Sequence, residues 1–375
     1  MFILLKGGEC YSPEYLGKKD ILIVSGKVYR VEDNIPGTIF EDLQIIDCKG
    51  CIVCPGFIDQ HVHIAGGGGE QGPLSKTPGL GVMDIIGAGV CTVVGILGTD
   101  DITRSMAELL AKARALEQEG ITSYIYTGCY SIPPATLTGS VKKDIAYIDK
   151  VIGLGEIAIA DHRSSHPTLQ DLKELSAEVR VGGLIGGKPG ILHLHVGEGK
   201  EGISLLFKLL EESDFPAGMF VPTHLNRNKA LFNQALEYCK AGGNIDLTAG
   251  ERSEKGYSIP DALGIIFSRD LDYRKVTVSS DGNGSVPEGS DYSDSAGKVL
   301  QLFKDIRSCI VDKKLDVKKV LCTVTSNVAG LLDIYPRKGA VKAGSDADIL
   351  VLDSGFNIKM VIAGGRVLIN NKPDG

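Results

Sequence analysis

Two histidines one residue apart, His61 and His63, are the first side chains in the sequence whose spacing could support metal chemistry. Residues 57–64 are predicted to form a strand. Successive strand side chains point to opposite faces, so both imidazoles would point to the same face and could bind one metal ion. A buried histidine pair with polar partners is the alternative for such a motif in isolation. The interpretation therefore depends on what the rest of the chain supplies.

Further residues that can bind metals lie in or directly after other predicted strands: Glu156 at the start of 156–160, His195 in 191–196, His224 in 219–225 and Asp281 after 276–280. Imidazole and carboxylate ligands suit zinc or a similar divalent ion. Four histidines and two carboxylates are too many for a single catalytic ion with an open position. They predict two ions bridged by a carboxylate and by hydroxide, an arrangement that lowers the pKa of the bridging water and polarises a carbonyl group.

The middle of the chain alternates strand and helix patterns. Eight apolar or β-rich runs occur at 57–64, 91–97, 123–127, 156–160, 191–196, 219–225, 244–248 and 276–280. Helices are predicted over 105–118 and 168–179, and after Asn226 as a capping residue. Eight such units predict a (β/α)8 barrel over residues 56–336, with its active site at the carboxyl ends of the strands. An open doubly wound sheet is the alternative, but the first strand–helix turn lacks the G-x-G-x-x-G pattern.

The two ends of the chain have a different pattern, of short alternating strands separated by turn residues. Examples are 21–24 and 28–31 near the N-terminus, and 347–353 and 360–365 near the C-terminus. These hairpin-like segments cannot bury a core alone. We therefore expect residues 1–55 and 337–375 to pair into one small β-sandwich domain beside the barrel.

Composition limits the possible partners and the cellular location. The 375 residues are 43% hydrophobic, and the net charge of −7 arises from interspersed acidic and basic residues, which makes nucleic acid an unexpected partner. No run approaches the ~20 apolar residues of a membrane span. Cys48, Cys51 and Cys54 have the spacing of part of an iron–sulfur motif, but position 58 is isoleucine, so buried reduced thiols are the favoured interpretation of the nine cysteines. We expect a cytoplasmic enzyme.

Several motifs together resemble the amidohydrolase superfamily and, within it, the isoaspartyl (β-aspartyl) dipeptidases. The superfamily features are D-x-H-x-H at 59–63, the later histidines and Ser-Ser-Asp-Gly at 279–282. The dipeptidase features are the motifs at 67–70, 97–100, 126–130, 138–141, 161–164, 224–227 and 280–285. The resemblance covers essentially the whole chain. It implies hydrolysis of the isopeptide bond of a small β-aspartyl dipeptide, and a homo-oligomer, by analogy an octamer.

The resemblance also implies a role for each site residue. His61 and His63 would hold one ion, His195 and His224 the other, with two Zn²⁺ ions expected per chain; Asp281 would ligate and shuttle a proton. Many relatives bridge the two ions with a carboxylated lysine, whereas the corresponding position here is Glu156, which would supply the bridging carboxylate directly. His193 is expected to lie behind the ligands or to fill the barrel, and Asp59 to orient a ligand.

The implied substrate-binding residues are Gly68, Gly69, Glu70, Thr99, Tyr130, Arg163, Arg227 and Ser285. Glu70 would bind the free amino group, the two arginines would bind carboxylates, and Tyr130 would donate to the developing oxyanion. Taken singly, the arginines could be surface residues and Tyr130 could belong to the core. Two alternatives remain for the whole protein: a cyclic-amide hydrolase of the dihydropyrimidinase or dihydroorotase type, and a catalytically silent scaffold.

Overall fold

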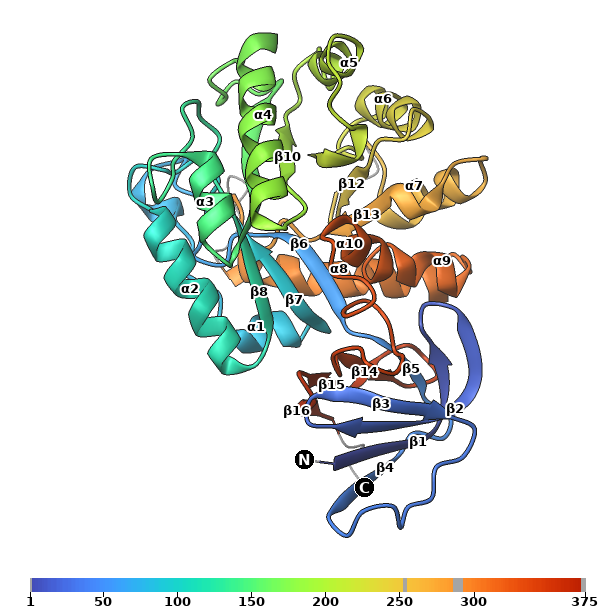
Figure 1. Ribbon diagram of the computed structural model, residues 1–375. Coiled ribbons are helices and arrows are strands. Elements are labelled where there is room, and N and C mark those ends of the chain that lie inside the picture. The colour runs from blue at the N-terminus through green and yellow to red at the C-terminus, as the bar shows by residue number, and fades with distance from the viewer. Residues whose placement is uncertain (1, 252–254, 286–292, 372–375) are drawn as a thin grey trace.

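The computed structural model describes residues 2–251, 255–285 and 293–371. It contains a strand–helix barrel and a smaller β domain that holds both ends of the described chain (Figure 1). Residues 1 and 372–375, which the sequence assigns to the β domain, lie outside the described residues. The predicted (β/α)8 barrel with a small β domain built from both termini is confirmed, and that domain, predicted as a β-sandwich, is formed by one continuous sheet. The division at residues 55/56 and 336/337 stays a prediction.

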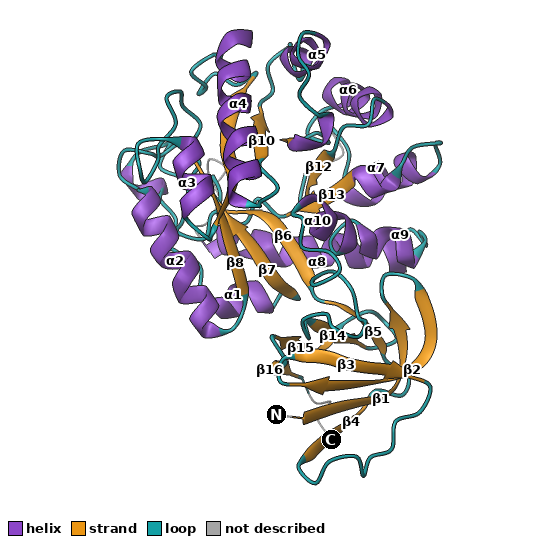
Figure 2. Ribbon diagram, viewed as in Figure 1, coloured by secondary structure: helices purple, strands orange, loops and turns teal. Residues whose placement is uncertain are grey.

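Eight strands form the barrel, and a helix follows each of them. The strands are β6 (Phe57–Val62), β7 (Val90–Gly95), β8 (Thr122–Thr127), β9 (Val151–Ile159), β10 (Ile191–Val196), β11 (Phe220–Thr223), β12 (Ile245–Thr248) and β13 (Val276–Ser279). The helices are α1 (Val82–Ile86), α2 (Met106–Glu119), α3 (Val141–Tyr147), α4 (Leu169–Gly186), α5 (Ser204–Glu211), α6 (Lys229–Lys240), α7 (Ile259–Phe267) and α8 (Ser293–Val311). Figure 2 shows these helices arranged around the outside of the strands.

The barrel closes through hydrogen bonds at two seams. Strands β6 to β11 form one parallel sheet, and β12 pairs with β13. The Leu225 N–H donates to the carbonyl of Asp246 at the first seam, and Val62 forms a parallel bridge with Gly282 at the second. Two further helices, α9 (Val317–Cys322) and α10 (Ser326–Leu331), follow α8. Val328 and Ala329 of α10 pack in one apolar cluster with residues of the barrel strands.

Helix capping agrees with the sequence patterns at two helices and differs at a third. Ser105 caps α2 and Thr168 caps α4, each by accepting a backbone N–H three residues on. Helix α4 extends to Gly186, beyond the predicted end at residue 179. The prediction that Asn226 caps the next helix is wrong: Asn228 caps α6, because the Asn226 amide instead bonds the backbone of Thr248 and Tyr257.

The β domain is one mixed sheet to which both ends of the chain contribute. Its strands are β1 (Phe2–Tyr11), β2 (Tyr15–Val24), β3 (Lys27–Glu32), β4 (Leu43–Asp47), β5 (Ile52–Pro55), β14 (Ile349–Leu352), β15 (Ile358–Ala363) and β16 (Arg366–Asn370). The order is β16-β15-β14-β5-β1-β2-β3, with β4 also paired to β1. Not all neighbouring strands form the hairpins that the sequence pattern suggested: β4 and β5 do not pair with each other but both pair parallel to β1, and β5 also pairs antiparallel with β14.

Side-chain alternation in β14 joins the two domains. Ile349 and Val351 lie in the apolar core of the β domain, whereas Leu350 and Leu352 belong to the core cluster of the barrel. The buried Lys338 ammonium adds a polar contact near this junction, 2.6 Å from Asp348 and 3.0 Å from Asp346.

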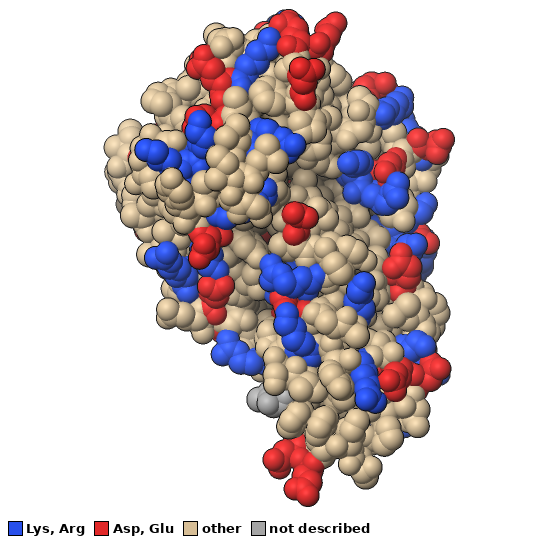
Figure 3. Space-filling view, viewed as in Figure 1, with Lys and Arg blue, Asp and Glu red and all other residues tan. Residues whose placement is uncertain are grey.

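Three short 3₁₀ turns complete the described elements: η1 (Pro73–Ser75), η2 (Ala217–Met219) and η3 (Tyr273–Lys275). All nine cysteines are buried and unbridged, as the sequence indicated. Within the described residues, no helix has the length and apolar character needed to cross a membrane. Lysines and arginines alternate with acidic residues over the face shown in Figure 3.

Candidate metal centre and substrate cleft

The imidazoles of His61 and His63 converge on one buried carboxylate. Strand β6 ends at Val62, so His63 lies just beyond it, yet the Nε2 atoms of both rings approach Glu156, at 3.4 Å for His61 and 3.7 Å for His63. Asp281 approaches the same two nitrogens, with Oδ1 3.5 Å from Nε2 of His61 and 3.3 Å from Nε2 of His63. The predicted shared direction of the two imidazoles is therefore present.

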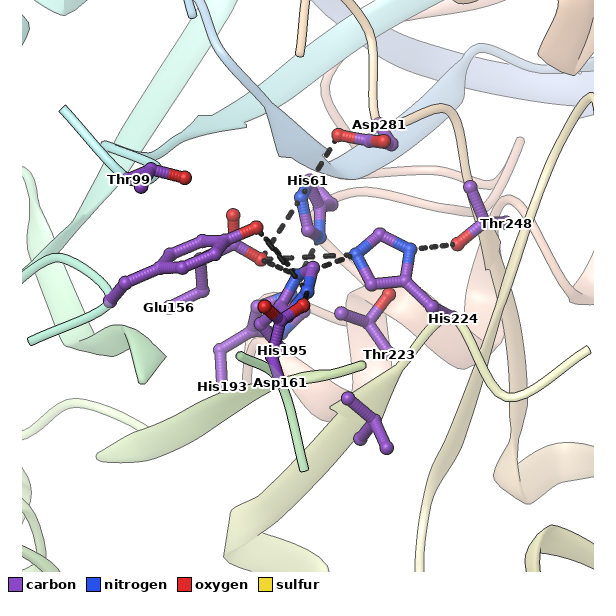
Figure 4. A network of polar contacts seen from close by, with 12 residues as sticks. His61, Thr99, Glu156, Asp161, His193, His195, Thr223, His224, Thr248 and Asp281 are labelled. Atoms are coloured by element: carbon purple, nitrogen blue, oxygen red, sulfur yellow. Dashed lines mark hydrogen bonds and ion pairs between the residues drawn. The ribbon is translucent and has the colours of Figure 1, made fainter. Parts of the chain in front are cut away.

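Two further histidines, one in strand β10 and one directly after β11, also lie close to the Glu156 carboxylate. Oε2 of Glu156 is 3.4 Å from Nδ1 of His195 and 4.0 Å from Nε2 of His224, and those two nitrogens are 3.0 Å apart. Figure 4 shows the Glu156 carboxylate pointing toward the imidazoles of His61, His195 and His224. Two sets of three potential ligands result, His61–His63–Glu156 and Glu156–His195–His224, and they share Glu156.

The strand boundaries explain the position of Glu156. The prediction that Glu156 begins a strand is wrong, because β9 begins at Val151 and ends at Ile159. Glu156 therefore lies in the second half of the strand, toward the carboxyl end where barrel sites form. The glycines at 153 and 155 obscure this strand in the sequence.

The donor set fits divalent cations. Zinc bonds of about 2.0–2.2 Å to nitrogen or oxygen would place tetrahedral ligand atoms about 3.4 Å apart, which is close to the distances above. Within the described residues, neither oxygen of Glu156 has a hydrogen-bond partner, nor has Nε2 of His61, although all three atoms are buried. A buried carboxylate without such partners requires nearby positive charge.

Electrostatics at Glu156 lead to the same conclusion. Burial would raise the pKa of Glu156, but the neighbouring imidazoles, His61 first, outweigh burial and lower the pKa to about 2. Burial would likewise lower the pKa of His61, but the charge of Glu156 prevails and raises that pKa to about 9. The site therefore favours an ionised carboxylate surrounded by cations, a requirement that metal ions would meet in place of protons.

Contacts behind the ligands orient their rings. Nδ1 of His224 lies 2.8 Å from Oγ1 of Thr248, and Nδ1 of His61 lies 2.9 Å from Nε2 of His193. The His193 ring is fully buried and stacks on Tyr126, which agrees with its expected position behind the ligands. Asp59 instead accepts backbone N–H groups of His61 and Ser280, so it joins β6 to the end of β13 and does not contact an imidazole of this set.

Two ligand residues adopt a backbone conformation that is uncommon for residues other than glycine. His224, directly after β11, has φ 63°, and Asp281, two residues after the end of β13, has φ 50°. Such conformations are unfavourable and concentrate at functional sites.

The predicted substrate-binding residues meet beside the histidines. Oε1 of Glu70 accepts from Oγ1 of Thr99 at 3.1 Å and from Oγ of Ser285 at 2.5 Å, and NH1 of Arg163 lies 3.5 Å away. The preceding loop depends on Gly68, where φ is +69° and a Cβ would lie 2.2 Å from the carbonyl oxygen of Ser75. Gly69 also has positive φ, at +104°.

The Tyr130 side chain points toward the proposed metal ligands. Its hydroxyl lies 2.8 Å from Nδ1 of His195, and the guanidinium carbon of Arg163 lies 5.3 Å from the centre of its ring. Burial, and then the charge of Glu156, raise the pKa of Tyr130 well above 10. The hydroxyl therefore keeps its proton at neutral pH and can donate a hydrogen bond.

A cleft of about 1000 Å³ opens next to the histidines. Residues after β9, β10 and β11 line it, among them Asp161, Arg163, Glu198, Lys200, Leu205 and Arg227. Both arginines are held by acceptors of the chain itself: Nε of Arg227 donates to Glu251 at 3.3 Å and NH1 to the Val196 carbonyl at 3.1 Å, while Nε and NH2 of Arg163 donate to Asp161. Sequence reasoning assigned no role to Asp161, Thr248 or Glu251, because their contacts with His195, His224 and Arg227 join residues that are distant in the sequence.

Comparison with known proteins agrees with this geometry. A crystal structure of a β-aspartyl dipeptidase from the thermophilic, keratin-degrading Fervidobacterium islandicum AW-1 is 44% identical to the chain, covers 99% of it and 98% of its own chain, and superposes with a TM-score of 0.92. The model of the amidohydrolase family matches residues 262–368. The chain belongs to this family.

Two further relatives are informative. A structure of the β-aspartyl dipeptidase from the same organism, in complex with the dipeptide β-Asp-Leu, is 43% identical with a TM-score of 0.91 and covers 99% and 98% of the two chains. A dihydroorotase of Aquifex aeolicus (strain VF5) is 30% identical over 168 residues, which is 43% of this amidohydrolase and 36% of the relative. The predicted family and its metal-dependent hydrolase class are confirmed; the roles of single residues stay predictions.

Proposed function

We propose that the protein hydrolyses the isopeptide bond of β-aspartyl dipeptides with two divalent metal ions, and that these ions are zinc. One observation carries the proposal: Glu70, Thr99, Ser285 and Arg163 form a polar network beside a double histidine–carboxylate cluster. Similarity over nearly the whole chain to a β-aspartyl dipeptidase structure with bound β-Asp-Leu supports the same substrate class.

The histidine cluster would hold the two ions. His61 and His63 would bind one ion, His195 and His224 the other, with Glu156 between them and Asp281 beside the first pair. Bound there, divalent ions would lower the pKa of water and polarise the scissile carbonyl group.

The substrate would be fixed at both ends. The Glu70 carboxylate would bind the free α-amino group, with the backbone at Gly68 and Gly69 close by. Arg163 and Arg227 would bind carboxylates from the cleft that they line. The leaving residue would then extend into this cleft.

During hydrolysis, Asp281 would transfer a proton and Tyr130 would stabilise the developing negative charge. A water molecule would add to the carbonyl carbon and lose its proton to an oxygen of Asp281, which would deliver that proton to the leaving nitrogen as the C–N bond breaks. The Tyr130 hydroxyl would donate to the oxygen on which negative charge develops.

A cyclic-amide hydrolase is the second candidate, supported by the partial similarity to dihydroorotase. Two arginines that line one cleft, with Glu70 beside one of them, favour a substrate that carries an amine and carboxylates. A silent scaffold is less favoured because all six proposed metal ligands are present.

The test compares substrates on one metal-loaded preparation. Metal-free protein would be reconstituted with Zn²⁺, and release of leucine from β-Asp-Leu would be measured beside ring opening of dihydroorotate. We expect β-Asp-Leu to be cleaved only after metal is added, and dihydroorotate to react far more slowly. Preferential turnover of dihydroorotate would refute the proposal.

A cytoplasmic location and a homo-oligomer, by family analogy an octamer, belong to the same proposal. Light scattering would measure the size of the oligomer.

A further inference from the structure

The carboxylate of Asp161 contacts both a proposed metal ligand, His195, and a residue of the substrate cleft, Arg163. Asp161 follows β9, five residues after Glu156, and its side chain is only 7% exposed. Its Oδ2 lies 3.0 Å from Nε2 of His195. Its two oxygens also accept from Nε of Arg163 at 2.9 Å and from NH2 at 2.8 Å.

We infer that Asp161 is a positioning residue that fixes both the metal ligand His195 and the cleft residue Arg163, and thereby couples metal binding to substrate binding. The Arg163 half of this inference rests on the proposed function. The His195 half concerns metal affinity and does not depend on the substrate.

The contact with His195 determines which ring nitrogen can bind a metal ion. An ionised carboxylate only accepts hydrogen bonds, so Nε2 of His195 carries the hydrogen and Nδ1 keeps its lone pair. Nδ1 is the atom that faces Glu156 and His224, at 3.4 Å and 3.0 Å. A carboxylate partner also makes the imidazole a more basic ligand.

The other ligands have weaker partners behind them. His224 contacts the hydroxyl of Thr248, and His61 contacts the imidazole of His193. His195 alone, among the four histidines of the described cluster, has a carboxylate on its outer nitrogen. Loss of Asp161 should therefore weaken metal binding more than loss of the Thr248 hydroxyl.

The contact with Arg163 fixes the plane of the guanidinium group. With Nε and NH2 bonded to Asp161, NH1 points toward Glu70, 3.5 Å from its Oε1. The group that would meet a substrate carboxylate is thus oriented before the substrate arrives, and binding loses less side-chain entropy.

The variant Asp161→Asn breaks this arrangement at nearly constant size. An amide has one acceptor oxygen, so its NH2 group must face a donor of either His195 or Arg163. We expect the dissociation constant for Zn²⁺, measured on metal-free protein by chelator competition, to rise about 10–100-fold. Thr248→Val should raise it less, and Arg163→Met should leave it within about threefold of wild type.

The coupling is tested at saturating Zn²⁺ with kcat/KM for β-Asp-Leu. The effects of Asp161→Asn and Arg163→Met should be non-additive in the double variant, because both remove the same orientation of Arg163.

If Asp161→Asn does not fold, as judged by circular dichroism, Asp161→Glu replaces it. This variant keeps the charge and should lose less Zn²⁺ affinity than Thr248→Val. Wild-type Zn²⁺ affinity in Asp161→Asn, an Asp161→Glu loss above that of Thr248→Val, or additive effects in the double variant would overturn the inference. Failure to cleave β-Asp-Leu at all would refute the proposed function but leave the metal-affinity result standing.

Discussion

Oε2 of Glu156 lies 3.4 Å from Nε2 of His61, in the barrel interior where neither side chain is more than 1% exposed. The same oxygen lies 3.4 Å from Nδ1 of His195. One carboxylate thus stands between two histidine pairs and needs no chemical modification to reach both. A carboxylated lysine, in contrast, would form only after reaction with CO2.

Glu156 should make metal assembly independent of bicarbonate. Metal-free protein reconstituted in CO2-depleted buffer should regain two ions per chain and full turnover without added bicarbonate. Glu156→Gln keeps the size and removes the charge, so it should weaken binding of both ions and nearly abolish turnover. Elemental analysis and β-Asp-Leu assays measure both effects. A marked bicarbonate requirement would show that a lysine elsewhere provides the bridge.

Asp281→Asn should separate proton transfer from substrate binding. The amide keeps a similar shape but cannot accept the proton, so kcat should fall by about 100-fold or more while KM changes little. Metal content must be measured on the same sample, since Asp281 also lies 3.3 Å from His63. A variant that keeps most of its turnover with both metals bound would exclude the proposed proton shuttle.

Arg227→Met should reduce kcat/KM for β-Asp-Leu. Loss of a charged partner to a substrate carboxylate removes about 2 kcal/mol or more, which corresponds to roughly 30-fold. Lys229→Met is the matched control, because Lys229 is an exposed cation two residues away that does not line the cleft. Equal effects of the two substitutions would indicate a general charge effect and would argue against a specific contact.

Lys338→Met should destabilise the fold without a direct effect on the site. Lys338 is 3% exposed and lies within 3.0 Å of both Asp346 and Asp348. Its loss leaves the buried Asp348 carboxylate without this cation, whereas Asp346 keeps Lys27 and Arg337. We expect a loss of about 3–5 kcal/mol in the free energy of unfolding. Lys173→Met, which breaks the more exposed pair with Glu212, should change it by less than about 1 kcal/mol. Denaturant titrations of both variants measure the difference; similar losses would contradict the expected role of burial.

Hydrophobic periodicity was sufficient to predict the barrel and the β domain, because each of the eight barrel strands leaves a local pattern of apolar residues. It was insufficient wherever a contact distant in the sequence decides the outcome. The cap at Asn228 is one example, because Asn226 is equally suited to capping and is taken by Thr248 and Tyr257.

In the site, too, local patterns could be predicted from the sequence and contacts between distant residues could not. Metal-type residues could be found from their chemistry and from their positions near strand ends. The strand around Glu156 was placed too late, because two glycines interrupt its apolar run. Asp161 could not be assigned a role, because its partner His195 lies 34 residues away and no local pattern joins them.

Hydrolysis of β-Asp-Leu and of α-Asp-Leu by the zinc-loaded protein tests whether the site is specific for the isopeptide bond. The two dipeptides contain the same atoms, but the positions of amine and carboxylate relative to the scissile bond differ. Glu70 and the two cleft arginines can therefore be satisfied together by only one isomer, and site groups that a bound substrate leaves unpaired discriminate strongly. We therefore expect a kcat/KM for β-Asp-Leu that is greater than that for α-Asp-Leu by about 100-fold or more. Equal values for the two isomers would contradict this expectation.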